Sequence, residues 1–431
     1  MIRNVLSEFI QWLASFGPIV VIFWIRDLLA DGLGWLSQVW SATGSVWLLG
    51  LSAELWMTRR GLRRLPRLPE TVPAADALPS LSVLLAARNE EHTIENALRT
   101  LLATDYPNMQ VIAVNDRSDD RTGAILECLA AKNLRLEVIH ITELPPGWLG
   151  KNYALAQAAS RATGEWLLFT DADITFAPST IARAVVFAQE HQLQHVTAVP
   201  NIITRGLWLR VFLAQFSLAL SIWQRPWEAA SPGSRCSVGF GAFNLVKADS
   251  YRAIGGHEAI PLAVADDMAL GRELKAAGCR QMLVIASAGG ADQAPLSVEW
   301  YPDVPAAIRG FEKNAFALFN FQALPVVLWS ILATIMIFAP LVALFLAPGW
   351  HRIPWVIAAI LASASLGVAG RELLGSFPWP MSLLYPMAQC MLTWTLVRSA
   401  VVTLRGGGVR WRDTFYPLHE LRGAQVGKRH R

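Results

Sequence analysis

Two aspartates one residue apart follow a short run of bulky apolar residues near the middle of the chain. The segment reads GEWLLFTDADITF (164–176), and its two carboxylates are Asp171 and Asp173. If the strand continues through them, both side chains point to one face, because successive residues of a strand alternate. Like charges side by side repel unless a cation lies between them, and carboxylates together with substrate phosphates hold Mg2+ or Mn2+. The pair therefore predicts a metal site that offsets the charge of a departing diphosphate.

A second acidic pair begins an amphipathic segment, AVADDMALGRELKAAG, with Asp266 and Asp267 at its start. Carboxylates are favoured at a helix N-terminus as caps and by the helix dipole, which explains one aspartate better than two. The alternative is that one of them is a general base that takes the proton of an alcohol. Both interpretations remain open from the sequence alone.

The segments around these acids alternate between strand-like and helix-like patterns. Apolar runs of strand length lie at 81–87, 109–116, 134–141 and 165–174, and helical spacing of apolar residues is found at 91–103, 122–132 and 152–162. This alternation predicts an α/β fold with a mostly parallel sheet and helices on both faces. In such sheets ligands bind at the carboxyl ends of the strands.

Polar residues follow three of these strands, which tests that expectation. The first is followed by Arg88, Asn89 and Glu90, the second ends in Asn115 and Asp116, and the fourth is followed by Asp171 and Asp173. We expect them to meet on one rim, although each alone is also typical of a loop or a helix cap, the interpretation preferred for Asp119 and Asp120. No glycine-rich fingerprint follows the first strand, and GWLGKN around Lys151 lacks P-loop spacing, so dinucleotide and P-loop sites are disfavoured.

The composition indicates contact with lipid. Of 431 residues, 53% are hydrophobic and 16% charged, whereas soluble chains carry about 25% charged residues. The apolar residues gather in the flanks. We predict an N-terminal membrane anchor of one or two helices at 1–57 (apolar runs 9–25 and 35–57), a basic Pro-rich linker at 58–80, a catalytic domain at 81–310, a C-terminal transmembrane region at 311–404 and a basic tail at 405–431.

Charge next to the apolar runs indicates the orientation. Arginines at 59, 60, 63, 64 and 67 mark the cytoplasmic side, so we expect a multi-pass protein of the cell inner (plasma) membrane with a cytoplasmic catalytic domain. Three C-terminal runs (324–347, 354–370 and 381–404) would place the basic tail outside. Either one run is re-entrant or interfacial, or a further helix lies within 306–324.

The segment 205–227 is long and apolar, yet it cannot cross the membrane alone, because Asp171 before it and Asp267 after it must share one side. Its polar residues Arg210, Ser217, Ser221 and Gln224 fall on one helical face. This pattern predicts a helix lying in the membrane surface, and the alternative is a buried core helix of the domain. An interfacial helix would bring the catalytic rim to a lipid hydroxyl.

Taken in order, the motifs resemble a known family. The segments LSVLLAARNEEHTIENALRTLLATDYPNMQVIAVNDRSDDRT, TDAD and GFGAFNLVKADSYRAIGGHEAIPLAVADDMALGRELKAAG resemble membrane-bound family-2 glycosyltransferases of the nucleotide-sugar-binding GT-A type, over about residues 81–280. The segment LPPGWLGKNYALAQA resembles the hopanoid- and carotenoid-associated subgroup. Ceramide glucosyltransferase-like enzymes are more distant relatives.

The resemblance implies a role for each matching residue. It implies a nucleoside site lined by Ala87, Arg88 and Glu90, with Asp116 on the base or ribose, and a metal-binding DxD of Asp171 and Asp173. It also implies a catalytic base at Asp267, preceded by Asp266, and places Lys151 near the diphosphate. The residues implied close to the donor sugar are Gly239, Gly241 and the turn Gly255-Gly256. The family's Q-x-x-R-W signature is absent. In its place stand Arg309 and Lys313, interpreted mainly as surface charges, and its absence weighs against processive polysaccharide synthesis.

The sequence thus predicts an inverting, metal-dependent glycosyltransferase with Mg2+ or Mn2+ as cofactor. Its expected partners are a nucleotide-sugar donor, a UDP-sugar above others, a membrane lipid acceptor and the bilayer, and no nucleic acid. Two alternatives stay open: a processive polysaccharide synthase, and a catalytically silent membrane scaffold of the same fold. The tail segment VRWRDTFYP (409–417) is considered to fold back on the active site, without a physical argument for it.

Overall fold

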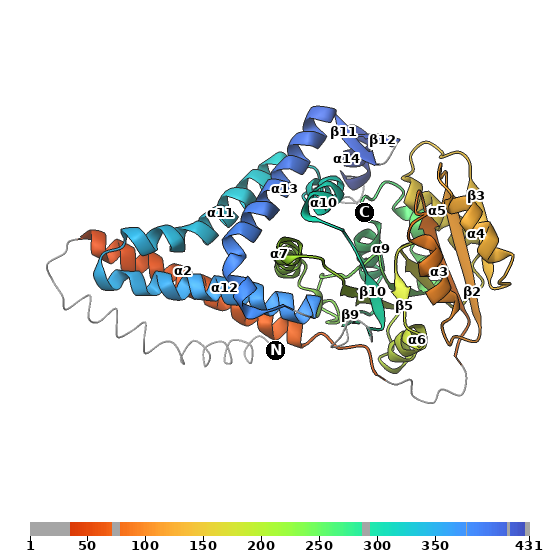
Figure 1. The fold of residues 1–431 in the computed structure, drawn as a ribbon, viewed down its shortest axis with the longest axis horizontal. Helices are drawn as coiled ribbons and strands as arrows, with labels where there is room; N and C mark the ends of the chain where they lie inside the picture. The colour runs from red at the N-terminus through yellow and green to blue at the C-terminus, as the bar shows by residue number, and fades with distance from the viewer. Residues whose placement is uncertain (1–34, 71–77, 287–293, 376, 412–413, 427–431) are drawn as a thin grey trace.

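The computed structural model describes residues 35–70, 78–286, 294–375, 377–411 and 414–426, and a seven-stranded sheet lies at the centre of its α/β domain (Figure 1). In spatial order the strands are β3 (Leu136–Ile141), β2 (Met109–Asp116), β1 (Leu81–Ala87), β4 (Trp166–Thr170), β8 (Asn244–Lys247), β6 (His195–Val199) and β9 (Gln281–Ile285). Neighbouring strands are parallel except where β8 pairs with β4 and β6. The expected α/β fold with a mostly parallel sheet is confirmed.

Helices cover both faces of this sheet, as near-continuous apolar strands require. One face packs on α3 (Ile94–Leu102), α4 (Thr122–Ala130) and α6 (Thr180–Glu190); the other packs on α5 (Gly150–Arg161), α8 (Ala248–Ala253) and α9 (Asp266–Ala276). Alternation along β1 shows this directly, because Val83 and Leu85 join the first apolar cluster and Leu84 the second.

The strand order creates a switch point between β1 and β4. From β1 the chain moves outward through β2 to β3, and α5 then returns it to β4 on the opposite side of β1. Leu85 pairs with Thr170, so the residues after both strands leave the sheet at the same level. Ligands of open α/β sheets bind in the crevice at such a point.

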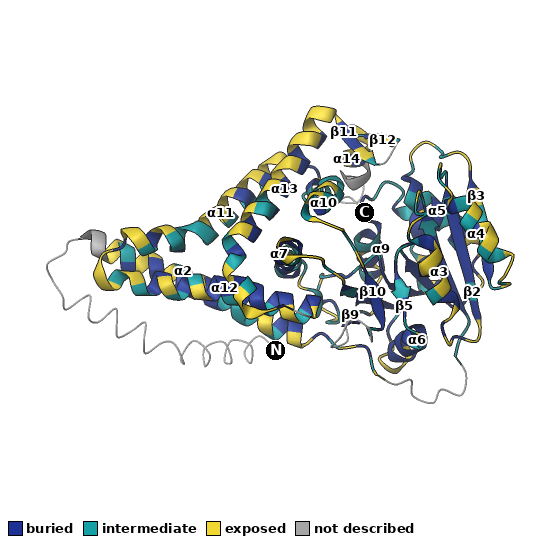
Figure 2. Cartoon of the chain, viewed as in Figure 1, coloured by how far each residue is buried: buried dark blue, intermediate teal, exposed yellow. Residues whose placement is uncertain are grey.

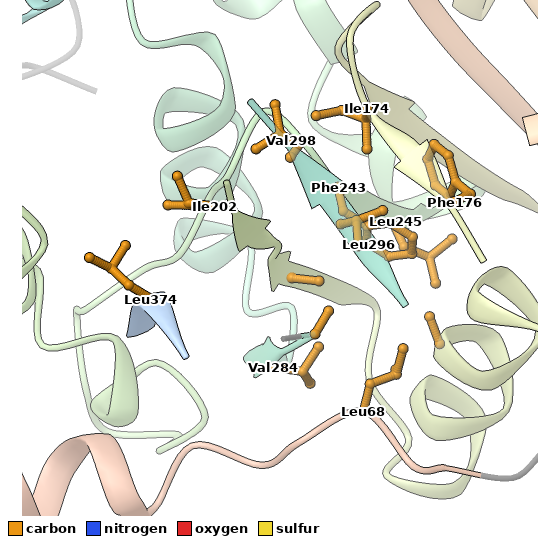
Figure 3. Close-up of a cluster of buried hydrophobic side chains, with 14 of the residues drawn as sticks. Leu68, Ile174, Phe176, Ile202, Phe243, Leu245, Val284, Leu296, Val298 and Leu374 are labelled. Atoms are coloured by element: carbon orange, nitrogen blue, oxygen red, sulfur yellow. The ribbon is translucent and has the colours of Figure 1, made fainter. Parts of the chain in front are cut away.

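A small second sheet connects this domain to the long helices. It consists of β5 (Thr175–Phe176), β10 (Leu296–Val298) and β7 (Asn201–Ile202). Figure 3 shows its apolar side chains together with Leu374 from the end of α12 (Ile353–Leu374), and all belong to one buried cluster. The domain and the helices therefore share a core.

The remaining helices form a second layer. They are α2 (Trp35–Arg63), α7 (Leu207–Gln224), α10 (Val304–Leu318), α11 (Ala323–Leu346), α12 and α13 (Tyr385–Gly406). Four segments of the described chain are long and apolar enough to cross a membrane: Leu207–Glu228, Ala323–Leu346, Gly349–Leu374 and Trp379–Gly406. Figure 2 shows α11 largely exposed, and its Leu332 and Phe345 are 60% and 84% accessible. Such an apolar surface is typical of lipid contact.

The membrane anchor expected at residues 1–57 lies only partly within the residues that the structure describes. The apolar run 9–25 lies outside the described residues. The run 35–57 forms most of α2, which at 29 residues is long enough to span although it is not among the four most apolar segments. It lies beside α12 (Figure 1), and Arg63 and Arg67 at its end are 3.9 and 3.8 Å from Glu372 at the end of α12.

The segment after α12 turns back along that helix. Phe377 packs at Gly370 and Trp379 at Gly367, where an added Cβ would meet each ring at 2.4 and 2.3 Å. The Ser382 hydroxyl is 2.9 Å from that of Ser363. The chain thus retraces about 16 Å of α12 at a rise of about 1.5 Å per residue before α13 begins. The tail after α13 reaches the α/β domain, where the Tyr416 hydroxyl meets the amide of Gly150, and a re-entrant or interfacial run stays a prediction.

Helix α7 crosses the other long helices. In Figure 1 it is seen along its axis, whereas α2 and α12 extend across the view. It packs against α12 and α13, where Gln215 donates to Gln389 at 2.8 Å. On its polar face Ser221 is buried, while Trp208 and Trp223 are about half exposed, and its place in the membrane surface stays a prediction. Exposed tryptophans are typical of a membrane–water interface.

Candidate functional site

One cavity of about 670 Å³ opens at the carboxyl ends of β1, β2 and β4. Its other walls come from the loop before β8, the start of α9, α7, α10 and a hairpin of the C-terminal segment, β11 (Gly408–Trp411) and β12 (Thr414–Pro417). Except for Gly255 and Gly256, the structure brings the residues assigned to the site from the sequence to this cavity: Ala87, Arg88, Glu90, Asp116, Lys151, Asp171, Asp173, Gly239, Gly241, Asp266 and Asp267.

Asp171 and Asp173 are brought together by a turn rather than by a strand. Strand β4 ends at Thr170, and Asp171 to Asp173 lie in the turn that follows. The argument from strand alternation is therefore wrong, although both side chains do line the cavity. Gly241 makes room for this turn, since a Cβ on it would lie 2.7 Å from a carboxylate oxygen of Asp171.

Asp173 is a carboxylate in an unfavourable environment. Burial, followed by the charges of Asp171 and Glu90, raises the pKa of Asp173 to about 7. Its Oδ1 is buried and accepts no hydrogen bond within the described chain. Buried polar atoms are almost always satisfied, so an orphan oxygen beside other carboxylates fits a cation that supplies the missing partner. No group of three or more metal-ligating side chains occurs among the described residues, so such a cation would need ligands from a bound substrate as well.

Lys151 lies between the two acidic pairs. It is at the start of α5, and its Nζ is 2.8 Å from Asp171 Oδ1 and 3.3 Å from Asp266 Oδ2. Burial lowers the pKa of Lys151, but the charges of Asp171 and Asp266 outweigh it and raise the pKa overall. The lysine is therefore a fixed positive charge within reach of both carboxylate pairs.

The second acidic pair does not act as an ordinary helix cap. The N-cap position of α9 is Ala265, and Asp266 instead pairs with Lys151. Asp267 Oδ1 accepts from the amide of Met268 at 2.8 Å. Burial, followed by the charge of Asp266, raises the pKa of Asp267 to about 6. A carboxylate with this pKa is ionised at neutral pH and is still a useful proton acceptor.

A glycine places Asp267 against the loop before β8. A Cβ on Gly239 would lie 2.1 Å from the carbonyl oxygen of Asp267. Gly239 and Gly241 therefore allow close approach to the protein's own acidic residues. Gly255 and Gly256 do not line the cavity, and Gly256 packs on the ring of Tyr251, so their expected place near a donor sugar is wrong.

Asp116 marks another corner of the cavity. Arg117 folds back on it and donates from Nε to Oδ1 at 2.7 Å and from a terminal nitrogen to Oδ2 at 3.2 Å. Asn89 and Arg117, which follow β1 and β2, both have a φ of 53°. Left-handed backbone at non-glycine residues is uncommon and concentrates at functional sites. The start of α5 packs tightly here, because a Cβ on Gly150 would lie 2.4 Å from Asp116 Oδ2.

Several lining residues were missed or undervalued from the sequence. Arg309 and Lys313, interpreted mainly as surface charges, line the cavity, and Lys313 lies 4.0 Å from the centre of the Trp411 ring. The missed residues are Arg117, Trp300 and Tyr301. Trp411 and Tyr416 also line the cavity, and they belong to the tail segment 409–417 that was considered to fold back on the active site. Only Arg117 carried a local signal, as a charged residue directly after a strand-end aspartate. Burial and the nearby charges of Asp173 and Asp171 raise the pKa of Tyr301, which confirms its closeness to them.

The helical layer adds apolar side chains to the cavity lining. They are Phe216 and Leu220 of α7, Phe311 and Leu318 of α10 and Val402 of α13. The rings of Phe216 and Phe311 stack with centres 4.2 Å apart. The strand ends thus give the cavity its acidic pairs and Lys151, and the helical layer gives it an apolar surface together with the charges of Arg309, Glu312 and Lys313 of α10.

Comparison with known proteins agrees with the sequence resemblance. Residues 82–251 match the family described as Glycosyl transferase family 2. The 4,4'-diaponeurosporenoate glycosyltransferase of Staphylococcus aureus (strain MRSA252) is 27% identical over 197 residues, which is 44% of this chain and 50% of that protein. Other strains of S. aureus have similar relatives, for example strain USA300 with 27% identity over the same shares. The chain therefore spans about half the length of the curated relatives it matches.

Two solved structures are also similar to the chain. Mannosyltransferase PcManGT from Pyrobaculum calidifontis, in complex with GDP-Man and Mn2+, has a TM-score of 0.47 and 19% identity, covering 84% of this chain and 99% of that one. A crystal structure of S. aureus TarS in complex with UDP has a TM-score of 0.37 and 18% identity, covering 78% and 94%. The family match and the sequence relatives agree: residues 82–251 are similar to glycosyl transferase family 2 domains.

Proposed function

We propose that this chain is a membrane-anchored, metal-dependent inverting glycosyltransferase that moves a sugar from a nucleotide-diphosphate donor, a UDP-sugar above others, to the hydroxyl of a membrane lipid. The observation that carries the proposal is the cavity itself. Both acidic pairs and Lys151 line it next to the strand ends, and apolar residues of α7, α10 and α13 line it from the helical layer, beside Arg309 and Lys313. A polar donor and an apolar acceptor could meet there.

Asp267 is assigned as the base. It takes the proton from the acceptor hydroxyl as that oxygen bonds to the anomeric carbon, while the bond from this carbon to the diphosphate oxygen breaks and inverts the centre. The raised pKa of Asp267, about 6, supports this assignment. Asp266 holds Lys151 in place through their 3.3 Å ion pair.

Asp171 and Asp173 would hold Mg2+ or Mn2+ together with the donor diphosphate. When bound, the ion would neutralise negative charge on the leaving group. The unsatisfied Oδ1 of Asp173 supports this role. Lys151 adds a positive charge beside Asp171, near the N-terminus of α5, where anions are favoured.

We assign the nucleoside end to Ala87, Arg88, Glu90 and Asp116, at the ends of β1 and β2. All four line the same cavity as the acids, at the strand-order switch point where α/β sheets bind ligands. Gly239 and Gly241 keep the opposing loop close to the acidic residues.

The membrane arrangement is part of the proposal. The basic end of α2 and the end of α12 meet beside the α/β domain, which supports a cytoplasmic domain at the inner membrane with the helices spanning it. Helix α7 would lie in the interface, across the spanning helices, with Trp208 and Trp223 exposed to it. The S. aureus relative is named a 4,4'-diaponeurosporenoate glycosyltransferase, which is consistent with an acceptor from the bilayer.

The test is transfer of a labelled sugar. Membranes containing the chain are incubated with Mn2+ and a panel of labelled nucleotide sugars, and the masses of the extracted lipids are measured by mass spectrometry. We expect one sugar to be added to one lipid class, with a UDP-sugar as donor. A product that lengthens with time would favour a processive synthase. No transfer and no nucleotide-sugar binding with Mn2+ would favour a silent scaffold and contradict the proposal.

A further inference from the structure

The C-terminal hairpin is a built part of the cavity. Its turn back from α13 begins at Gly407, whose φ of 68° lies in the left-handed region that glycine adopts freely. The carbonyl of Gly407 accepts from the amide of Leu418 at 2.9 Å. Strand pairing places Val409 opposite Tyr416 and Trp411 opposite Thr414, so these four residues share one face. Val409, Trp411 and Tyr416 all line the cavity.

Apolar packing holds the hairpin between the helical layer and the loops that carry the site. Val409 and Tyr416 of the hairpin and Leu418 and Leu421 of the helix after it belong to one buried cluster. The other members come from the start of α5, the loop before α9, and α10, α11, α13 and their connections: Leu149, Val264, Phe316, Phe321, Val326, Leu396 and Ala400. Leu149 directly precedes Gly150, and Val264 lies two residues before Asp266. Arg422 of α14 (Leu418–Val426) donates to the carbonyl of Phe321 at 2.8 Å.

The hydroxyl of Tyr416 meets the nucleoside end of the cavity. It accepts from the backbone amide of Gly150 at 3.3 Å, and the Arg117 side chain lies at the same place, because a Cβ on Gly150 would be 2.6 Å from a terminal nitrogen of Arg117. Arg117 in turn makes the two-pronged contact with Asp116. A backbone amide is a donor only, so the tyrosine oxygen accepts in its contact with Gly150. Its own proton is therefore free, and within the described chain it is donated to no side chain or carbonyl.

We propose that Tyr416 belongs to the site that binds the nucleotide-sugar donor. Its oxygen orients the start of α5 and the neighbouring Arg117, and its hydroxyl group donates a hydrogen bond to an oxygen atom of the bound nucleotide. This inference rests on the proposed function, because it takes the ligand of that cavity to be a nucleotide-diphosphate donor. It makes the C-terminal segment, 266 residues away from Gly150 in sequence, a part of the donor site.

The experiment compares nucleotide binding by the full chain and by Tyr416→Phe, in detergent with Mn2+, with UDP as the probe in calorimetric titration. Phenylalanine keeps the buried ring and removes only the hydroxyl. Loss of one hydrogen bond to a ligand, together with release of Arg117, is expected to weaken UDP binding about five- to tenfold. The matched control is Phe415→Leu, an exposed residue on the other face of the same strand, which should bind UDP like the unaltered chain.

A second comparison separates a role in the site from a role in folding. If Tyr416 acts through Arg117, the double variant Tyr416→Phe with Arg117→Met should lose no more affinity than the weaker-binding single variant. Additive losses would contradict action through Arg117. A Tyr416→Phe protein that binds fewer equivalents of UDP at unaltered affinity would show partial unfolding and overturn the inference.

The outcomes distinguish the inference from the function on which it rests. Tight UDP binding by the unaltered chain and by Tyr416→Phe alike overturns the role of Tyr416 and leaves the proposed function standing. If the unaltered chain binds none of UDP, GDP, ADP, CDP and dTDP, the proposed function fails, and the inference fails with it.

Discussion

Asp173→Asn is expected to stabilise the protein above pH 7 in the absence of divalent cations. Burial and then the charges of Asp171 and Glu90 raise the pKa of Asp173 from 3.8 to about 7. The folded protein thus binds this proton more tightly than the unfolded chain does. Its contribution to stability is complete below pH 3.8 and is lost as the pH rises to about 7. Above that pH the wild type carries an unfavourable charge that the asparagine variant lacks.

The size of the effect follows from the pKa. A difference of about 3 pKa units corresponds to an upper limit of about 4 kcal/mol in the free energy of unfolding. Solvent reaches part of the side chain, which lowers the expected gain to roughly 2 kcal/mol. For a domain of this size the melting temperature should rise by roughly 4–8 °C.

The assay is thermal unfolding of the purified full chain in detergent at pH 8, first with EDTA and then with Mn2+. In EDTA the variant should melt above the wild type, and the gap should shrink at pH 6, where the wild-type carboxyl is mostly protonated. Added Mn2+ should stabilise the wild type and leave the variant unchanged, since the variant lacks one proposed ligand.

The control is Asp119→Asn, which removes an exposed carboxylate from the loop that follows β2 and should change the melting temperature by less than about 2 °C. A variant at position 173 that melts at or below the wild-type temperature at pH 8 would refute the reasoning about charge. Equal stabilisation of both proteins by Mn2+ would refute the metal role.

Three further perturbations test the site. Asp267→Asn should abolish turnover while its affinity for the nucleotide-sugar donor stays within about twofold, and normal turnover would contradict the assignment of Asp267 as the base. Wild-type activity should rise with pH around the pKa of about 6, because the base must be ionised. Lys151→Met should weaken UDP binding at least tenfold by leaving two acidic pairs without their cation, whereas the exposed Lys132→Met should not. Gly239→Ala should lower the melting temperature, because its Cβ would lie 2.1 Å from a carbonyl oxygen, while Gly233→Ala, with no atom within 4 Å, should be silent.

Local patterns predicted the first four strands along the chain, whereas β6, β8 and β9 of the same sheet were not expected. The strands at 81–87 and 109–116 were placed with the boundaries that β1 and β2 have, because a strand buried on both faces is a continuous apolar run. The helices α3, α4 and α5 were each found within three residues of their ends. Residues directly after the strands were also expected on one rim, since parallel strands end together.

Predictions failed where a local rule was extended too far. Alternation was applied through Asp173, but the apolar run ends at Thr170 and the chain turns there. Helix α7 was expected to lie in the membrane surface because its polar residues share one face, and that placement stays a prediction, although Ser221 of this face is buried against the helical layer. A helix that is covered on one side by other helices and exposed on the other does not follow the simple amphipathic rule.

The sequence by itself determined the fold class, the rim of acids and the membrane character, because each is encoded in local composition, spacing and strand ends. The tertiary structure alone decided that the chain retraces α12, that Arg309 and Lys313 line the cavity, and that Tyr416 meets Gly150 and Arg117. These features depend on contacts between residues tens to hundreds of positions apart. No periodicity along the chain encodes such contacts, since they form only when separate apolar surfaces pack together.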